Sequence, residues 1–239
     1  MYKNKIFKAL ILASGSGQRM QSKVQKQYLE IHQKPMLIYS LEVFEQSPID
    51  EIILVVKAGE EAYCQDLVQQ YALKKVKKIV SGGSERYNST ANGLAAAAPC
   101  DYVLIHDSAR PCVTGDIIIR CMDTVIETGA CSAGVPATDT INLVDDDQKV
   151  VQTLNRNSLW SVQTPQTFCY DTINNAHKRL QERLPLLSSA ERLAITDDVK
   201  IAQVFAHVNV HMVLGAYENI KVTTPFDLKI AATFLDDHL

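Results

Sequence analysis

The sequence predicts an α/β fold with a mostly parallel central sheet and helices on both faces. Two observations lead to this prediction. Short, continuous apolar runs suit strands that are buried on both faces, and segments with helical periodicity lie between them. This alternation is typical of parallel sheets, because each helix carries the chain back to start the next strand. The clearest apolar runs are Phe7–Ala13, Glu51–Val56, Lys78–Ser81 and Tyr102–His106.

Helices are expected between and after these strands. The helical patterns cover Met36–Gln46, Gly59–Ala72 and Arg86–Ala97. A further helix is predicted to begin after Thr114, a residue suited to the N-cap, and to run to about Thr128. Gly129 follows, and glycine commonly ends a helix in the left-handed conformation.

The pattern changes at Asp139. Residues Thr140–Val144 and Val150–Leu154 alternate as strands do, and they flank the polar segment Asp145–Lys149. Two such strands around a short polar segment predict a β-hairpin that projects from the main sheet.

The last third of the chain returns to alternating helices and strands. We predict a helix at Asp171–Arg183, and another at Asp197–Phe205 with Thr196 as its N-cap. Val208–Leu214 is expected to form a strand. A final helix should follow Thr224 to about Leu235, because Thr224 is succeeded by proline and then by an acid in the first turn.

Composition limits the classes of function. The 239 residues carry a net charge of −3, whereas a protein that binds nucleic acid through bulk charge should be basic. None of the six cysteines forms a closely spaced pair, so a zinc site is not expected. The sequence has no apolar run long enough to span a membrane. We therefore expect a single cytoplasmic domain over residues 1–239 that binds neither nucleic acid nor membrane.

The first candidate site follows the strand Phe7–Ala13, where the chain enters Ser14-Gly15-Ser16-Gly17. Small residues there allow backbone N–H groups to approach a ligand closely. Met20 replaces the third glycine of a dinucleotide loop, and the Gly-Lys-Ser/Thr of a P-loop is missing. Arg19 and Lys26 add two cations, so the loop suits a triphosphate. The alternative is a tight turn beside two solvated cations.

Two more motifs follow strands. Asp107 comes at the end of Tyr102–His106 and could contact Mg²⁺ beside a phosphate, or it could cap the next turn while Arg110 pairs with a carboxylate. Gly82-Gly83 follows Lys78–Ser81, where Ser84 and Ser89 could bind a base edge. Alternatively, Ser84 could be the N-cap of the next helix.

Cations and hydroxyls that suit a phosphate monoester are scattered through the later sequence. They are Thr140, Arg156, Thr164, Thr196 and Lys221. Their spacing alone does not bring them together, and each cation could be an ordinary surface charge.

Taken in order, these motifs resemble the 2-C-methyl-D-erythritol 4-phosphate cytidylyltransferase family, part of the sugar-phosphate nucleotidylyltransferases. The resemblance covers the chain from Ala9 to Leu235. The matching segments are Ala13–Met20, Lys26-Gln27-Tyr28, Gly82-Gly83, Arg86, Ser89, His106–Pro111, Asp139-Thr140-Ile141, Leu159-Trp160, Gln163–Gln166, Thr196-Asp197-Asp198 and Asn219–Pro225.

The resemblance implies a Rossmann-like nucleotidyltransferase fold that transfers CMP from CTP to methylerythritol phosphate in non-mevalonate isoprenoid biosynthesis. It implies Mg²⁺, held mainly by the CTP phosphates with Asp107 as a possible ligand. It also implies a homodimer in which a hairpin arm, here residues 139–160, helps to form the partner's active site.

The resemblance also implies roles for individual residues. Arg19 and Lys26 would hold the triphosphate, and Arg156 and Lys221 would complete the catalytic set. The residues implied around CTP are Ala13, Ser14, Gly15, Gly17, Gly83, Ser84, Ser89, Asp107 and Ser108. The residues implied around the acceptor are Asp107, Thr140, Arg156, Thr164, Thr196 and Lys221.

Four positions depart from the family pattern. Gln25 replaces a usual proline, Ser14 an alanine, and Asn155 an aspartate. Ser84 stands where many members have aspartate, which bears on the contact to cytosine. None of these departures removes a cation.

Two alternatives remain open. Ribitol 5-phosphate cytidylyltransferases share the fold and the nucleotide, so the acceptor could be ribitol phosphate. A nucleotide-binding protein without activity is the alternative from another class, and the intact set of cations speaks against it.

Overall fold

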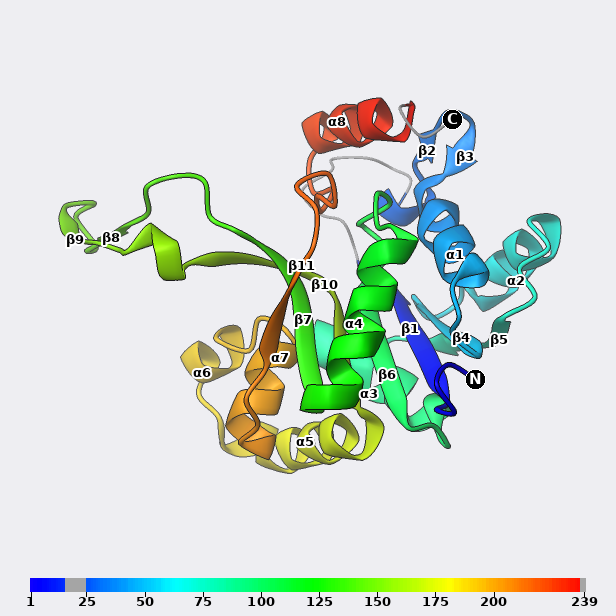
Figure 1. Ribbon diagram of the computed structural model, residues 1–239, viewed down its shortest axis with the longest axis horizontal. Coiled ribbons are helices and arrows are strands. Elements are labelled where there is room, and N and C mark those ends of the chain that lie inside the picture. The colour runs from blue at the N-terminus through cyan, green and yellow to red at the C-terminus, as the bar shows by residue number, and fades with distance from the viewer. Residues whose placement is uncertain (16–24, 237–239) are drawn as a thin grey trace.

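The computed structural model describes residues 1–15 and 25–236, and its centre is a seven-stranded sheet with the order β11-β7-β10-β6-β1-β4-β5 (Figure 1). The strands are β1 (Phe7–Ala13), β4 (Glu51–Val56), β5 (Val76–Ser81), β6 (Tyr102–Asp107), β7 (Ala130–Pro136), β10 (Trp160–Cys169) and β11 (His211–Leu214). The short strands β2 (Glu30–Ile31) and β3 (Lys34–Pro35) form a separate antiparallel pair.

The sheet is mostly parallel, as predicted. Strand β1 lies parallel to β4 and β6, β4 to β5, and β7 to β11, while β10 runs antiparallel to both β6 and β7. Strands β7 and β10 were not expected from the sequence. Strand β10 contains Pro165 and a register shift between Val162 and Gln166, and proline within a run normally argues against a central strand.

Helices cover both faces of the sheet, which confirms the predicted layering. Helices α1 (Met36–Gln46), α2 (Glu61–Gln70) and α4 (Gly115–Thr128) contribute to the core on one face. Helices α3 (Arg86–Ala97), α5 (Tyr170–Arg183) and α7 (Asp198–Ile201) contribute to the core on the other, and α6 (Ser189–Leu193) lies nearby. Helix α8 (Pro225–Asp236) packs in a smaller cluster with Met36 and Val222.

Strand β1 shows why the central strands are almost continuously apolar in sequence. Phe7, Ala9 and Ile11 point into one core, and Leu10 and Leu12 point into the other. All seven residues of β1 are buried. A strand with helices on both faces therefore cannot alternate polar and apolar residues.

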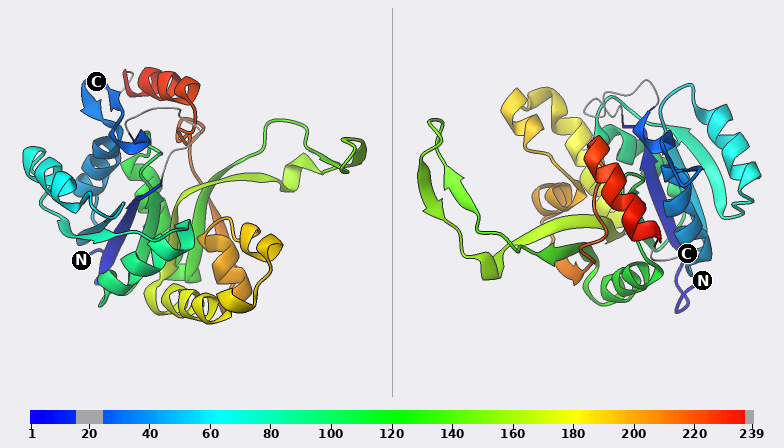
Figure 2. Two further views of the ribbon diagram at one scale, coloured as in Figure 1. Left: turned by 180° about the vertical axis from the view of Figure 1, so that it is seen from behind. Right: turned by 90° about the horizontal axis from the view of Figure 1, so that it is seen from above.

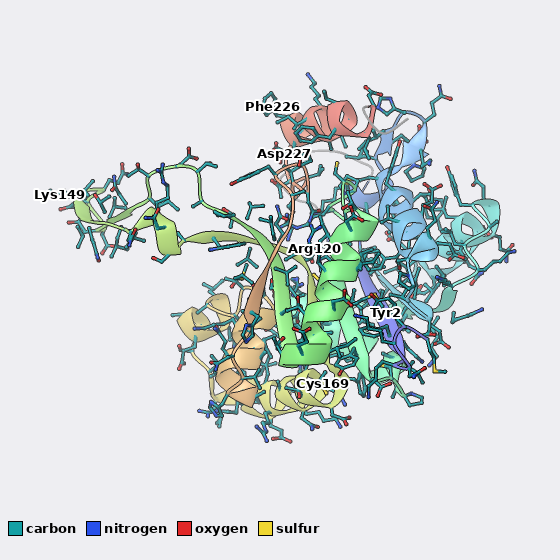
Figure 3. The ribbon with its side chains drawn as sticks, in the orientation of Figure 1. Tyr2, Arg120, Lys149, Cys169, Phe226 and Asp227 are labelled. Carbon is teal, nitrogen blue, oxygen red and sulfur yellow. The ribbon has the colours of Figure 1, made fainter. Side chains whose placement is uncertain are left out.

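The predicted hairpin is present and projects well away from the sheet (Figure 2). It consists of β8 (Asn142–Val144) and β9 (Val150–Thr153), and every residue of both strands is exposed. Lys149 lies at its far end (Figure 3). Val150 and Val151 are 60% and 62% exposed, which is unusual for valine and indicates a surface that packs against something else.

Two predicted helix caps need correction. The N-cap of α7 is Asp197, whose side chain accepts the Lys200 N–H, and not Thr196. Glu85, not Ser84, occupies the N-cap of α3. Aspartate caps the α7 turn because its carboxylate accepts an N–H that the helix leaves unpaired.

Some predicted elements also differ in extent. The helix predicted to reach Phe205 is α helical only to Ile201 and continues as a π-helix at Ala202–Ala206. Strand β11 begins at His211 and not at Val208. The start of α8 is as predicted, because Thr224 and Asp227 exchange hydrogen bonds between side chain and backbone. None of the helices in the described ranges is long and apolar enough to cross a membrane.

Gly129 gives a test of the predicted helix end. It follows α4 with φ of 78°, and a Cβ built there would meet no atom within 4 Å. Gly129→Ala should lower the free energy of unfolding by about 1 kcal/mol, because only backbone strain opposes the methyl group. Urea denaturation followed by circular dichroism measures the change.

Gly115→Ala is the matched control for this substitution. A Cβ at Gly115 also meets nothing within 4 Å, but Gly115 begins α4 without a positive φ. That variant should be neutral or slightly stabilising, since alanine is the better helix former. Equal destabilisation by the two substitutions would contradict the assignment.

Candidate active site

A cavity of about 420 Å³ opens at the carboxyl ends of β1, β4 and β6. In open α/β sheets, ligands bind at this edge. The lining residues are Leu12, Ala13, Ser14, Gly15, Lys26, Gln27, Lys57, Gly83, Ser84, Glu85, Arg86, Ser89, Asp107, Ser108, Ala109 and Lys221. In the described part of the chain, this lining holds four cations and two carboxylates, so the cavity suits an anionic ligand.

One wall of the cavity is built from small residues in close contact. The Ser14 hydroxyl lies 2.8 Å from the Ser89 hydroxyl, which accepts the Gly83 N–H at 3.1 Å. A Cβ on Gly82 would lie 2.4 Å from the Ser14 Cβ, and one on Gly83 would lie 2.3 Å from the Asn88 Cβ. The two glycines are therefore required where the β1 and β5 loops meet.

Lys26 reaches the cavity from a short 3-10 helix, Lys26–Tyr28. The Tyr28 hydroxyl donates to Glu60 at 2.7 Å, and the Gln25 side chain also donates to Glu60. Burial, and then the bonds to Cys64 and Glu60, hold the pKa of Tyr28 well above its usual range, so the hydroxyl stays a donor. Gln25, where the family usually has proline, thus anchors this turn to the start of α2.

Asp107, at the end of β6, is the centre of the charged groups. Its Oδ2 accepts from Lys221 Nζ at 2.6 Å, and its Oδ1 accepts from Arg86 Nε at 3.2 Å. Burial alone would raise the pKa of this carboxyl, but Arg86 and Lys221 outweigh it and hold the pKa far below its usual value. Asp107 is therefore ionised at any working pH.

Arg86 links the cavity to a second buried carboxylate. Its Nη1 donates to Asp198 Oδ2 at 2.6 Å, and Asp198 also accepts from His177 Nε2 at 3.0 Å. Burial raises the pKa of Asp198, yet Arg86 and His177 bring it below the ordinary range. Burial likewise lowers the pKa of Arg86, but Asp198 and Asp107 raise it overall, so the charges stabilise one another.

Thr164 supports the cavity from behind. It is 3% exposed and does not line the cavity. Its hydroxyl accepts the Asp107 N–H at 3.1 Å and lies 3.0 Å from His106 Nδ1. Burial lowers the pKa of His106 to about 4, so the ring is neutral at pH 7. The structure therefore places Thr164 where it fixes Asp107; whether it also contacts an acceptor stays a prediction.

Most of the residues predicted for the site come together in this cavity. Of the predicted CTP residues, all that lie in the described ranges line it. Lys26 and Lys221 do so as well. Arg19 and Gly17 lie outside the described residues.

Three predicted residues lie away from the cavity. Thr140 and Arg156 belong to the arm and its base, where Arg156 Nη1 donates to the Thr138 carbonyl at 3.0 Å. Thr196 is an exposed residue just before α7. A single copy of the chain does not gather these residues around the cavity.

Sequence reasoning did not select Lys57, Glu85 and Arg86 as site residues, although Arg86 belongs to the matching motif. Each follows a strand or begins a helix at the carboxyl edge of the sheet. Lys57 comes directly after β4, and that position was the available signal.

A metal would find few protein ligands here. No cluster of three His, Cys, Asp or Glu side chains that could hold a metal ion occurs within residues 1–15 and 25–236. Of the carboxylates in this part of the chain, Asp107 and Glu85 line the cavity. Mg²⁺ commonly binds through one or two carboxylates together with substrate phosphates, so this donor set fits Mg²⁺ only in the company of a nucleotide.

Comparisons with known proteins agree with this geometry. The family model for 2-C-methyl-D-erythritol 4-phosphate cytidylyltransferase matches residues 7–237. The enzyme of that name from Alkaliphilus metalliredigens is 44% identical, over 95% of this chain and 92% of its own. The one from Lachnospira eligens is 40% identical, over 95% and 98%.

Solved structures give the same result. The 4-diphosphocytidyl-2C-methyl-D-erythritol synthase of Anaerococcus prevotii superposes with a TM-score of 0.82 at 29% identity, over 97% of this chain and 99% of its own. The cytidylyltransferase of Francisella tularensis gives 0.76 at 26% identity, over 96% and 99%. The chain belongs to the 2-C-methyl-D-erythritol 4-phosphate cytidylyltransferase family.

Proposed function

We propose that this chain transfers CMP from CTP to 2-C-methyl-D-erythritol 4-phosphate, giving 4-diphosphocytidyl-2-C-methyl-D-erythritol and pyrophosphate on the non-mevalonate route to isoprenoid precursors. Family membership supports this proposal. The structural observation that carries it is the cavity at the strand ends, where glycine-rich loops face Lys26, Arg86 and Lys221 around the ionised Asp107. We also propose that residues 1–239 act as one nucleotidyltransferase domain.

The chemistry needs no covalent intermediate. A phosphate oxygen of the acceptor attacks the α-phosphorus of CTP in line, a new P–O bond forms, and the bond to the leaving pyrophosphate breaks. The attacking oxygen is already ionised, so no general base is required. Positioning and charge stabilisation then suffice for the reaction. Lys26 and Arg19 would hold the triphosphate, and Lys221 would lie beside the reacting phosphates.

The small-residue wall would take the nucleoside. Backbone groups of Ala13, Ser14 and Gly15 line this part of the cavity with Gly83, and the Ser84 and Ser89 hydroxyls stand next to them. Asp107 and Ser108 lie between this wall and Lys221, which suits the boundary of ribose and acceptor.

Mg²⁺ would be held mainly by the phosphates of CTP, and Asp107 could contribute one protein ligand. It would neutralise charge on the triphosphate when bound. Lys221 and Arg86 each bond one oxygen of Asp107, and their positive charges would offset the negative charge of that carboxylate.

We further propose a homodimer in which the arm completes the partner's acceptor site. The exposed valines of β9 and the distance of Thr140 and Arg156 from the cavity support this arrangement. In the dimer, Thr140 and Arg156 from one copy would join Lys221 of the other around the acceptor, with Thr196 outside the cavity at the edge of that site and Thr164 supporting Asp107 from behind.

The acceptor assay tests the proposed reaction directly. With CTP and Mg²⁺, pyrophosphate release should be rapid with methylerythritol phosphate and slow with ribitol 5-phosphate, since the family match names the former. Lys26→Ala is the control, and it should reduce kcat by about 100-fold if Lys26 stabilises the transition state.

Two results would reject the assignment. Turnover with ribitol 5-phosphate alone would favour the ribitol alternative. Binding of CTP without pyrophosphate release, with both acceptors present, would indicate a nucleotide-binding protein without activity.

Subunit mixing tests the shared site. Arg156→Ala and Lys26→Ala chains should each be nearly inactive alone. Refolded together in equal amounts, they should recover about a quarter of wild-type activity, because half the dimers are mixed and each of these has one intact site. Lys149→Ala, at the exposed end of the arm, is the control and should behave as wild type. No recovery on mixing would place Arg156 at its own subunit's site.

A further inference from the structure

A line of hydrogen-bonded side chains runs from helix α5 to the cavity. His177 Nε2 lies 3.0 Å from Asp198 Oδ1, and Asp198 Oδ2 lies 2.6 Å from Arg86 Nη1. Arg86 Nε lies 3.2 Å from Asp107 Oδ1, and Asp107 Oδ2 lies 2.6 Å from Lys221 Nζ. The line begins at His177 on α5 and ends at Lys221 in the cavity wall. It therefore offers a route by which His177 can set the positions of Asp107 and Lys221.

The inner end of this line is fully enclosed. Asp198 is 0% exposed and His177 is 2% exposed. A buried carboxylate is costly unless its oxygens are paired, and breaking one of its bonds leaves a charge uncompensated. Asp198 Oδ1 accepts from His177, and Oδ2 accepts from Arg86. His177 therefore holds one side of the carboxylate that holds Arg86.

Packing alone does not explain a histidine at position 177. Its Nδ1 is buried without a hydrogen-bond partner among the residues that the structure describes, which costs free energy that an apolar ring of similar shape would avoid. Its Nε2 supplies the hydrogen bond to Asp198. Within the described part of the chain, the histidine thus leaves Nδ1 unpaired while Nε2 donates to the Asp198 carboxylate.

The backbone around Asp198 is fixed separately. Gln166 Oε1 accepts the N–H groups of Asp198 and Val199, at 3.0 and 3.3 Å. Gln166 Nε2 donates to Asp197 Oδ2 at 3.0 Å. With the main chain held by Gln166, the direction of the Asp198 carboxylate depends on its two side-chain partners, His177 and Arg86.

Arg86 transmits this direction because its guanidinium is planar. A hydrogen bond from Nη1 and another from Nε, to two different carboxylates, fix both the plane and its rotation. The orientation of the guanidinium plane determines which Asp107 oxygen accepts from Arg86. Lys221 bonds the other oxygen.

We propose that His177 is a positioning residue for CMP transfer, acting through Asp198 and Arg86 to set the Asp107–Lys221 pair at the cavity. His177 is not among the residues that line the cavity in the described part of the chain. This inference rests on the proposed function, because its readout is turnover.

Three variants test it. His177→Phe keeps the ring and removes the donor, and kcat should fall about 10- to 100-fold, as for a small misplacement of reacting groups. The KM for CTP should change little, because Lys26 and the small-residue wall are untouched. His177→Gln places an amide nitrogen near the Nε2 position and should recover most of the lost kcat.

Leu180→Ala is the control for simple destabilisation. Leu180 lies on the same helix, is 0% exposed, and belongs to the apolar core rather than to the charged line. At a temperature where all variants are folded by circular dichroism, it should keep wild-type kcat. Wild-type turnover is measured first in the same preparations, so a failure of the proposed reaction is seen separately.

A double-mutant cycle gives the second readout. If His177 acts through Lys221, His177→Phe should cost little further kcat in a Lys221→Ala background, because both changes disturb the same line of bonded side chains. Near-wild-type kcat in His177→Phe, no recovery in His177→Gln, or independent effects on kcat in the cycle would each overturn the proposal.

Discussion

The structure depends above all on one buried carboxylate, Asp107, held between two cations. It ends the central strand β6 at 8% exposure, where an unpaired charge would cost several kcal/mol. Arg86 comes from α3, and Lys221 from the segment before α8, 114 residues along the chain from Asp107. The ion pairs therefore bring α3, β6 and the segment before α8 together at the cavity.

In the proposed site, the nucleotide side and the acceptor side would rest on different parts of the fold, one rigid and one projecting. The nucleotide side is made of strand ends and close glycine contacts, such as Gly82 against Ser14 and Gly83 against Asn88. Such contacts leave little room for movement. The acceptor side has Lys221 in place, while Thr140 and Arg156 stand on an exposed arm. This division accounts for why one chain shows a well-formed nucleotide wall and an acceptor wall that a second copy would complete.

The sequence predicted the parts of the fold whose signal is local. The apolar run of β1 and the glycine after α4 are examples, because burial on both faces and a positive φ each require particular residues. Strand β10 was not predicted, because Pro165 argues against a central strand and the strands that pair with β10 lie far away in the sequence. The cavity residues were predicted through strand ends and motifs. The pairing of Arg86 with Asp198, 112 residues apart, has no local signal and appears only in the folded chain.

In the proposed reaction, an ionised Asp107 would balance Arg86 and Lys221 beside the reacting phosphates. The most direct measurement is the kcat of Asp107→Asn, which keeps the size of the side chain and removes its charge. Asp107→Asn should fold with a kcat lower by about 100-fold, because Lys221 loses its counter-charge and the plane of Arg86 is released. A folded variant with kcat near that of the wild type would contradict it.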